Sequence, residues 1–264
     1  MIIKNKAARL FLVLGGFFIA NALIAEFIGV KIFSLEDTIG IKRAQIPIFG
    51  GSFSFHLTAG VLLWPVVFIM TDIINEYYGP KGVRFLSFLA AGLITYAFLI
   101  VVAAIQLSPS EYFRISSNAD DSNAAFKGVF GQGLWIIVGS LVAFLIGQIL
   151  DVLVFHKIKK TTGENRIWLR ATGSTLVSQI VDSFVVLFIA FYIGPRLEGA
   201  FGKQWTFNQV MVTATGNYIY KFVIALLLTP LIYLIHGWIE KYLGDRLATE
   251  MKNEAMANMA KSNE

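Results

Sequence analysis

The sequence predicts an all-α integral membrane protein, a bundle of six transmembrane helices in a single domain. Hydrophobic residue types make up 56% of its 264 residues and charged types only 15%, whereas soluble domains carry about 25% charge. The apolar residues fall into six long runs, each close to the roughly 20 helical residues that cross a hydrocarbon core. The predicted spans are 10–30, 53–74, 85–107, 134–155, 171–193 and 210–235.

The two ends of the chain predict a retained first helix and a polar tail. The first span follows the basic segment Met1–Arg9, so a cleaved signal peptide is the alternative. The apolar run Leu10–Val30 is longer than the usual signal core of about 7–15 residues, which favours a retained helix. Residues 240–264 are polar and predict a cytoplasmic tail that forms a fraying helix.

Two prolines lie inside predicted spans, Pro65 in the second and Pro230 in the sixth. Each would free a backbone carbonyl one turn earlier, at Val61 and Leu226. In a membrane such carbonyls are tolerated only where protein or water covers them. Two interpretations stay open, a packing kink or a broken helix beside a solute site.

The segments between the spans are short and predict no further domain. At the end of the first of them, residues 46–55 carry a Gly-Gly pair between two apolar runs, which predicts a small surface hairpin. Lys and Arg are twice as frequent on the side that holds both chain ends as on the other side. This bias and the even number of spans place the N and C termini in the cytoplasm.

Several function classes are excluded by missing motifs. The chain has no cysteine, hence no disulfide, thiolate nucleophile or Cys zinc site. Its basic residues lie between apolar runs, so we expect no direct nucleic-acid contact. It has no phosphate-binding G-x-x-x-x-G-K-[ST] run, so transport would be facilitated, ion-coupled or driven by a separate ATPase module. No hydrolase motif is present and the three histidines are far apart, so we expect no enzyme, metal or cofactor.

The polar residues inside the spans gather into stripes at helical spacing. A charge at the bilayer centre costs roughly 2.5–3.5 kcal/mol on insertion scales, so several of them need a use or a partner. Residues three or four apart share one helix face. The primary substrate-binding candidates are Asp72, Asn75, Glu76, Gln179, Asp182, Asn217 and Lys221. The secondary candidates are Asn21, Glu26, Gln148, Asp151, Arg170, Ser178 and Tyr218.

Structural explanations for these stripes stay open beside the functional one. The carboxylates of Asp72, Glu76, Glu26 and Asp151 stand near span ends, where water can solvate them. Asp182 and Lys221 lie near mid-span, and a structural ion pair is the alternative to a solute contact. Even that pair predicts a polar interior that faces a cavity or a neighbouring helix.

Carboxylates and amides together predict a solute that both donates and accepts hydrogen bonds. A planar heterocycle with an amidine-like N–H edge suits a carboxylate, which accepts two parallel bonds. Aromatic rings can sandwich such a base. The rings of Trp64, Phe184, Phe188 and Tyr218 are available, although packing is the commoner role of such rings.

Three blocks of residues resemble the queuosine precursor transporter family, also described as a vitamin uptake transporter family. The first block is the run Thr71–Gly79 with Lys81 and Arg84. The second is Arg170, Ser174-Thr175-Leu176, Ser178-Gln179 and Asp182-Ser183-Phe184. The third is Asn217-Tyr218, Lys221, Thr229-Pro230 and Tyr233. The six-span layout covers nearly the whole chain, and only the segment 108–133 is longer than the resemblance leads us to expect.

The resemblance implies import of 7-deazaguanine bases, namely 7-cyano-7-deazaguanine, 7-aminomethyl-7-deazaguanine or queuine, for the tRNA nucleoside queuosine. It also implies a bacterial or archaeal plasma (inner) membrane and a fold related to the substrate-binding subunits of energy-coupling-factor transporters. By hypothesis Asp182 or Glu76 holds the guanidine-like edge, while Gln179, Asn75 and Asn217 read the other edges. The alternatives are an importer of another heterocycle or vitamin, a membrane-embedded enzyme, and a non-transporting assembly factor. The oligomeric state stays open.

Overall fold

The computed structural model describes residues 5–43, 46–48, 51–53, 55–117, 121–131, 134–162, 167–197 and 205–260. Within these ranges, five helices are long and apolar enough to cross a membrane. In chain order the elements are α1 (Lys6–Ile28), β1 (Ile32–Ser34), α2 (Leu35–Ile39), β2 (Ile46–Ile48), β3 (Gly51–Phe53), β4 (His56–Thr58), the 3₁₀ helix η2 (Ala59–Leu62), α3 (Trp64–Ile105), α4 (Glu111–Ser117), α5 (Ser122–Phe130), α6 (Leu134–Thr162), α7 (Ile167–Leu187), the π-helical turn η3 (Phe188–Ile193), α8 (Gly194–Leu197), α9 (Phe207–Leu243) and α10 (Asp245–Ala260).

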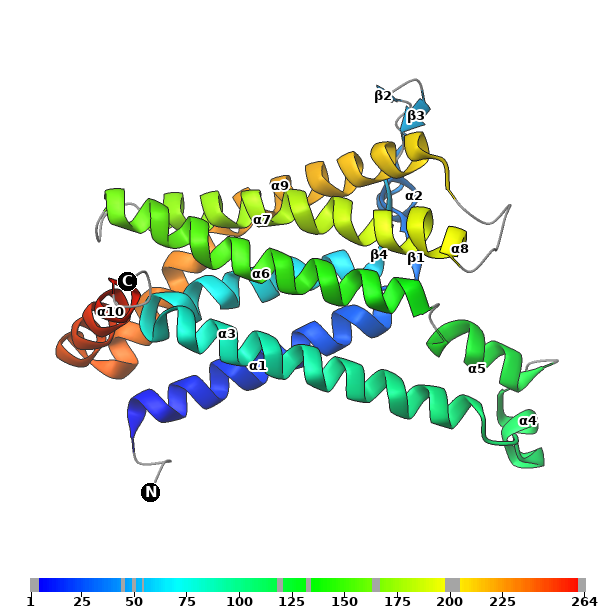
Figure 1. The fold of residues 1–264 in the computed structure, drawn as a ribbon, viewed down its shortest axis with the longest axis horizontal. Coiled ribbons are helices and arrows are strands. Elements are labelled where there is room, and N and C mark those ends of the chain that lie inside the picture. Colours follow the sequence, from blue (N-terminus) through cyan, green and yellow to red (C-terminus); the bar gives the residue numbers. More distant parts are fainter. Residues whose placement is uncertain are drawn as a thin grey trace.

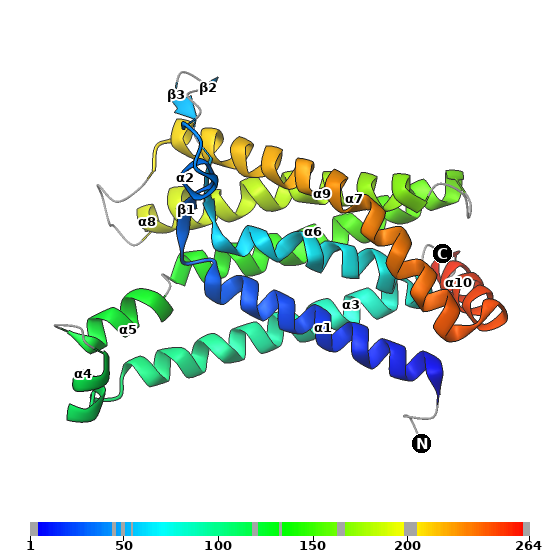
Figure 2. The same ribbon diagram turned by 180° about the vertical axis from the view of Figure 1, so that it is seen from behind.

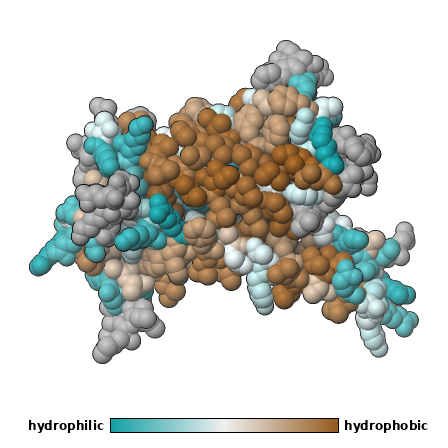
Figure 3. Space-filling model, viewed as in Figure 1, coloured by the Kyte–Doolittle hydropathy of each residue, from teal (hydrophilic) through white to brown (hydrophobic). Residues whose placement is uncertain are grey.

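The long helices run side by side along the longest axis of the molecule (Figures 1 and 2). The start of α1, the facing ends of α6 and α7, and α10 lie together at one end, which we call the termini end. The four strands, α2, α4, α5 and α8 lie at the opposite end, the strand end. Figure 3 shows apolar surface across the middle and polar patches at both ends, as expected for helices that cross a bilayer.

Helix α1 buries one face and leaves the other to lipid. Asn5 caps its start, because the side-chain oxygen accepts the backbone N–H of Ala7 at 2.9 Å. The buried face includes Phe18 and Ala22, and it packs against α3. On the other face, Leu12 is 67% exposed. A helix that is apolar all round is typical of a membrane span.

Helix α3 contains a sharp break rather than one straight course. Gly79 has φ 67° and ψ −173°, and Pro80 follows it. The first half runs from the strand end to the termini end, and the second half returns toward α4 (Figure 1). The two halves correspond to the predicted spans 53–74 and 85–107, but the helix starts at Trp64 and resumes at Pro80.

The predicted interruption at Pro65 is therefore wrong. Pro65 lies in the first turn of α3, where its missing N–H breaks no intrahelical bond and its fixed φ suits the helix. Since the residues before Trp64 form β4 and η2, the carbonyl of Val61 is not part of a broken helix. Pro230 does lie inside α9, as predicted.

Replacing Gly79 by Ala is expected to destabilise the protein by about 1–3 kcal/mol, since a side chain at this φ/ψ is strained. The new Cβ would also lie 3.3 Å from the backbone oxygen of Ala255 on α10. Thermal unfolding in detergent measures the effect. The control is Gly92→Ala on the same helix, which has open space and should leave Tm unchanged or raise it. Equal Tm values for both variants would contradict this account.

The predicted hairpin is confirmed, and a second strand pair joins it. β2 and β3 pair antiparallel with Ile46 opposite Phe53. β1 and β4 pair antiparallel with Phe33 opposite Leu57. The second pair was not predicted, because its strands have only three residues each and lie on either side of the hairpin.

The predicted fraying tail is wrong for α10, which packs against the rest of the protein. Ala248, Met251 and Ala255 are buried, and their spacing places them on one helix face. That face meets the break of α3 at Gly79. Lys252 adds a 2.6 Å ion pair to Glu240 on α9. The apolar stripe within a polar segment explains why this helix docks.

Candidate functional site

A cavity of about 210 Å³ lies between the helices near the strand end. Its polar lining from the long helices consists of Glu26, Ser140, Asp182, Ser183, Asn217 and Lys221. These side chains come from α1, α6, α7 and α9, so the cavity depends on the packing of four helices. Trp64 and Phe191 add aromatic walls. A few polar groups on an apolar and aromatic wall are typical of small-molecule sites.

Asp182 and Lys221 form a buried ion pair at the floor of this cavity. The Lys221 ammonium donates to Oδ2 of Asp182, and the side chains of Lys221 and Asp182 are only 6% and 9% exposed. Asn217 lies one turn before Lys221 on α9 and lines the same cavity. The Asn217 side-chain oxygen is buried and has no hydrogen-bond partner in the described parts of the chain. The cavity thus offers a paired carboxylate, an ammonium and an unused acceptor.

Glu26 lines the cavity from α1 and does not reach bulk water. It is 5% exposed, and the Ser140 hydroxyl of α6 donates to its Oε2 at 2.9 Å. The solvated-end explanation for Glu26 is therefore wrong. α1 brings this carboxylate inside because its buried face continues through Ala22 and Ala25.

An outer chamber of about 340 Å³ adjoins the cavity on the strand side. The two share Thr58, Phe191 and Asn217 among their lining residues. Phe191 stacks on Trp205 with ring centroids 4.3 Å apart and ring planes 14° apart. The shared residues make the chamber and the cavity one path that leads inward from the strand end.

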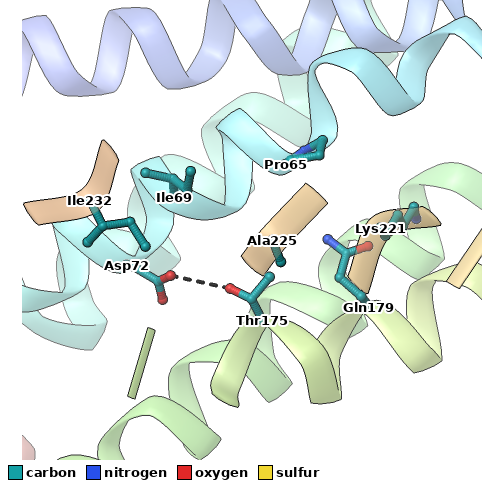
Figure 4. A pocket seen from close by; sticks show the side chains of 8 residues that line it. All are labelled: Pro65, Ile69, Asp72, Thr175, Gln179, Lys221, Ala225 and Ile232. Carbon is teal, nitrogen blue, oxygen red and sulfur yellow. Dashed lines mark hydrogen bonds between the residues drawn. The ribbon is translucent and has the colours of Figure 1, made fainter. Parts of the chain in front are cut away.

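A small inner pocket lies beyond the ion pair, deeper in the bundle (Figure 4). It measures about 10 Å³, room for about one water molecule. Asp72, Thr175, Gln179 and Lys221 supply its polar lining. The Thr175 hydroxyl donates to Asp72 Oδ2 at 3.3 Å, which is the dashed line in Figure 4. Lys221 lines both this pocket and the large cavity.

A polar cluster fills the bundle between this pocket and the termini end. Lys159 pairs with Glu76 at 3.1 Å, and both side chains are only 1% exposed. Gln148 Oε1 accepts the hydroxyl of Thr71 at 2.9 Å. Asp151 is 0% exposed. The solvated-end explanations for Asp72, Glu76 and Asp151 are therefore wrong, because α6 and α7 cover the face of α3 that carries Asp72 and Glu76.

The structure divides the predicted site residues into groups. Asp182, Asn217, Lys221 and Glu26 line the large cavity. Asp72 and Gln179 line the inner pocket. The buried residues that line neither are Asn75, Glu76, Gln148, Asp151, Ser178 and Asn21. Tyr218 is partly buried near Phe222, and nothing places it on a cavity. Arg170 belongs to α7, but its side chain lies outside the described part of the chain.

Sequence reasoning missed several residues of this interior, among them Ser140, Phe191 and Lys159. Ser140 is a single hydroxyl in an apolar run, and such residues are common in membrane helices. Phe191 was not separated from the other rings, because no pattern marks which ring faces a cavity. Lys159 was assigned to a basic segment after the fourth span, yet α6 continues to Thr162 and carries Lys159 inside. Only the ion pair with Glu76 shows that Lys159 is buried, and that pair is visible in the structure but not in the sequence.

An apolar exterior around a polar path that ends at a buried ion pair defines a multi-pass membrane protein with a site for a small polar solute. The chain belongs to the family described as "Putative vitamin uptake transporter", whose family model matches residues 58–235. No solved structure matches the chain.

Curated relatives carry names that agree with this family. The chain is 31% identical over 140 residues to the "Probable queuosine precursor transporter" of Bacillus subtilis, covering 53% of this chain and 58% of the relative. It is 30% identical over 142 residues to the protein of the same name from Haemophilus influenzae, covering 53% and 54%. It is 28% identical over 203 residues to the "Queuosine precursor transporter" of Escherichia coli, covering 76% and 82%. The matched stretches thus span little more than half of the first two relatives.

Proposed function

We propose that the protein imports queuosine precursors across a prokaryotic plasma membrane and that the 210 Å³ cavity is its substrate site. The observation that carries the proposal is the buried group of Asp182, Lys221 and Asn217 at the end of a path from the strand end. The names of the curated relatives give the substrate class.

The chemistry of a 7-deazaguanine fits this lining. The base presents an N1–H and a 2-amino group side by side, which one carboxylate can accept together, and Asp182 is the carboxylate at the floor. The ring carbonyl of the base can accept a hydrogen bond from Lys221. The side-chain oxygen of Asn217, which has no partner among the described residues, can accept a further N–H of the base. Trp64 and Phe191 supply faces for a planar ring. Glu76 takes no part, because it lies outside the cavity and pairs with Lys159.

The proposed topology has six crossings with both termini in the cytoplasm. Five long helices give six crossings when the halves of α3 on either side of Gly79 each cross once. The termini end would then face the cytoplasm, and the strand end, where the path opens, would face outward. A relation to the substrate-binding subunits of energy-coupling-factor transporters remains part of the proposal, and the energy source stays open among facilitation, ion coupling and a separate ATPase module.

A rescue experiment tests the substrate. The chain is expressed in cells that cannot make queuosine and lack an importer, and each deazaguanine is supplied in turn. Queuosine in the tRNA is the expected result for at least one precursor. If no precursor restores queuosine while the protein is present in the membrane, the substrate assignment fails.

Asn217→Leu is expected to lower uptake about fivefold without loss of protein. A hydrogen bond contributes about 1 kcal/mol, and 1.4 kcal/mol is tenfold in binding. The Asn217 oxygen has no partner among the described residues, so the fold loses little. The control is Asn208→Leu, an exposed position on the same helix, which should keep full uptake. Unchanged uptake in Asn217→Leu would remove Asn217 from the site.

A further inference from the structure

The Asp72–Asp151 pair lies outside the proposed substrate cavity and needs its own explanation. Asp72 comes from α3 and Asp151 from α6, and they are 2% and 0% exposed. Ser174 and Ser178 stand one turn apart on α7, and their hydroxyls lie 3.2 Å from Asp72 Oδ1 and 3.4 Å from Asp151 Oδ1, so the two carboxyl groups face neighbouring turns of one helix. In the described parts of the chain, Lys159 forms a buried ion pair with Glu76 and Lys221 forms one with Asp182.

The hydrogen-bond donors around Asp151 are too few for a carboxylate. Ser178 is 3.4 Å from Asp151 Oδ1, but the same hydroxyl is 3.0 Å from the carbonyl oxygen of Thr175. A carbonyl can only accept, so the one Ser178 proton belongs to that bond. Ser174 likewise donates to Asp72 Oδ1 at 3.2 Å. The second oxygen of Asp151 has no partner among the described residues.

An ionised Asp151 would therefore be a buried charge with too few donors, which is strongly unfavourable. Protonation of Asp151 removes the buried charge and adds a hydrogen-bond donor. Its O–H supplies the proton that the contact to Ser178 or Ser174 lacks. Two adjacent carboxyl groups that share one proton also avoid the repulsion of two like charges.

A route for that proton leads from the substrate cavity. The inner pocket beside Asp72 has room for about one water molecule. Gln179, 1% exposed, lines this pocket, and its side-chain oxygen has no described partner. Lys221 lines this pocket (Figure 4) and also the large cavity. A water in the pocket would thus connect Asp72 to the cavity, and Ser174 connects Asp72 to Asp151.

We propose that Asp151 and Asp72 form a proton-binding site and that the protein imports its base together with a proton. The proposal deepens the proposed function and rests on it. In this structure the path opens at the strand end while the carboxyl pair is enclosed. Because Asp151 has too few hydrogen-bond donors to be ionised, the pair holds a proton in this outward-facing state. The base and the proton would then be bound at the same time. That order of loading is symport.

Other charged groups near the pair leave this assignment intact. Glu76 on α3 adds a negative charge that acts on Asp72. On α6, Lys159 is held by Glu76, and His156 is buried. Asp182 on α7 and Lys221 on α9 hold each other. Among the described residues no ammonium or guanidinium group pairs with Asp72 or Asp151, and a proton fits this site better than a metal ion because the adjoining space holds only one water.

Uptake into vesicles that contain only the purified protein tests the proposal, with labelled 7-cyano-7-deazaguanine as the probe. An inside-alkaline gradient of one pH unit should concentrate the base up to about tenfold, since one unit corresponds to 1.36 kcal/mol. A protonophore should abolish this accumulation, and adding base should acidify the vesicle interior. These wild-type readouts need no variant.

Asp151→Asn is the matched variant, because the amide imitates the neutral carboxyl. It should exchange labelled for unlabelled base across the membrane yet fail to concentrate base. Asp37→Asn, an exposed carboxylate paired with Arg43, is the control and should concentrate base normally.

Three results would overturn the proposal. They are accumulation indifferent to the pH gradient, accumulation driven by a sodium gradient instead, and full accumulation by Asp151→Asn. If wild-type vesicles take up no base under any gradient, the proposed function itself fails and the inference falls with it. Uptake down the concentration gradient of the base that does not depend on pH would support the proposed function but contradict proton symport.

Discussion

Replacing Lys159 by Met is expected to lower the free energy of unfolding by about 3–5 kcal/mol, because it removes the ammonium from a buried Glu76. Glu76 is only 1% exposed, so water cannot take the place of the lost partner. Thermal unfolding of the purified protein in detergent measures the loss. A fall of this size is a large part of the roughly 5–15 kcal/mol that stabilises a domain.

Two further variants separate the ion pair from general damage. Lys160→Met changes the exposed neighbour of Lys159 on α6 and should leave Tm within experimental error. The double variant Glu76→Gln with Lys159→Met removes both charges and should recover at least half of the loss, since a neutral pair needs no compensation. Equal Tm values for Lys159→Met and Lys160→Met would show that the pair contributes nothing to stability.

Asp182→Asn is expected to lower uptake about 100-fold while the protein stays in the membrane. Hydrogen bonds to charged groups contribute about 1.5–3 kcal/mol, and an amide accepts two parallel N–H bonds poorly. The fold survives because the amide oxygen still accepts from Lys221, which lies at a cavity rather than in packed core. Uptake of labelled base at equal membrane levels measures the effect.

The double variant Asp182→Asn with Lys221→Met decides between a structural and a recognising role for this pair. Lys221→Met alone leaves a carboxylate without its partner and should cost about 3–5 kcal/mol of stability. The double variant should regain most of that stability but not the uptake. If uptake returns with the neutral pair, the pair is structural and Asp182 does not bind the base.

Hydropathy predicted the membrane class, since the length of an apolar run measures whether it can cross a bilayer. It also predicted a connection between the spans 53–74 and 85–107, where Gly79 breaks α3, but it began the first of these helices too early and therefore placed Pro65 inside it. A proline in the first turn of a helix interrupts nothing, whereas the positive φ of Gly79 reverses the chain. The start of a helix depends on which backbone groups are already bonded, here in β4 and η2, and composition does not reveal this.

The sequence predicted the candidate site only in part, because residue spacing shows which side chains share a helix face but not how the helices pack. The spacing of Asp182 with Gln179, and of Asn217 with Lys221, placed each pair on one helix face. Spacing does not give the rotation of one helix against another. Asp72 and Asp182 both looked like solute contacts, yet the structure places Asp182 on the large cavity and Asp72 on the one-water pocket behind it.

The sequence by itself determined that the protein spans a membrane and that its polar residues form stripes along the faces of the helices. Both follow from local features, the length of the apolar runs and the spacing of the polar residues. Only the tertiary structure decided the partners, such as Glu76 with Lys159 and Glu26 with Ser140. These residues are far apart in the chain, and the way the helices pack decides which of them meet. The same packing decides which carboxylates face a cavity and which are enclosed in protein.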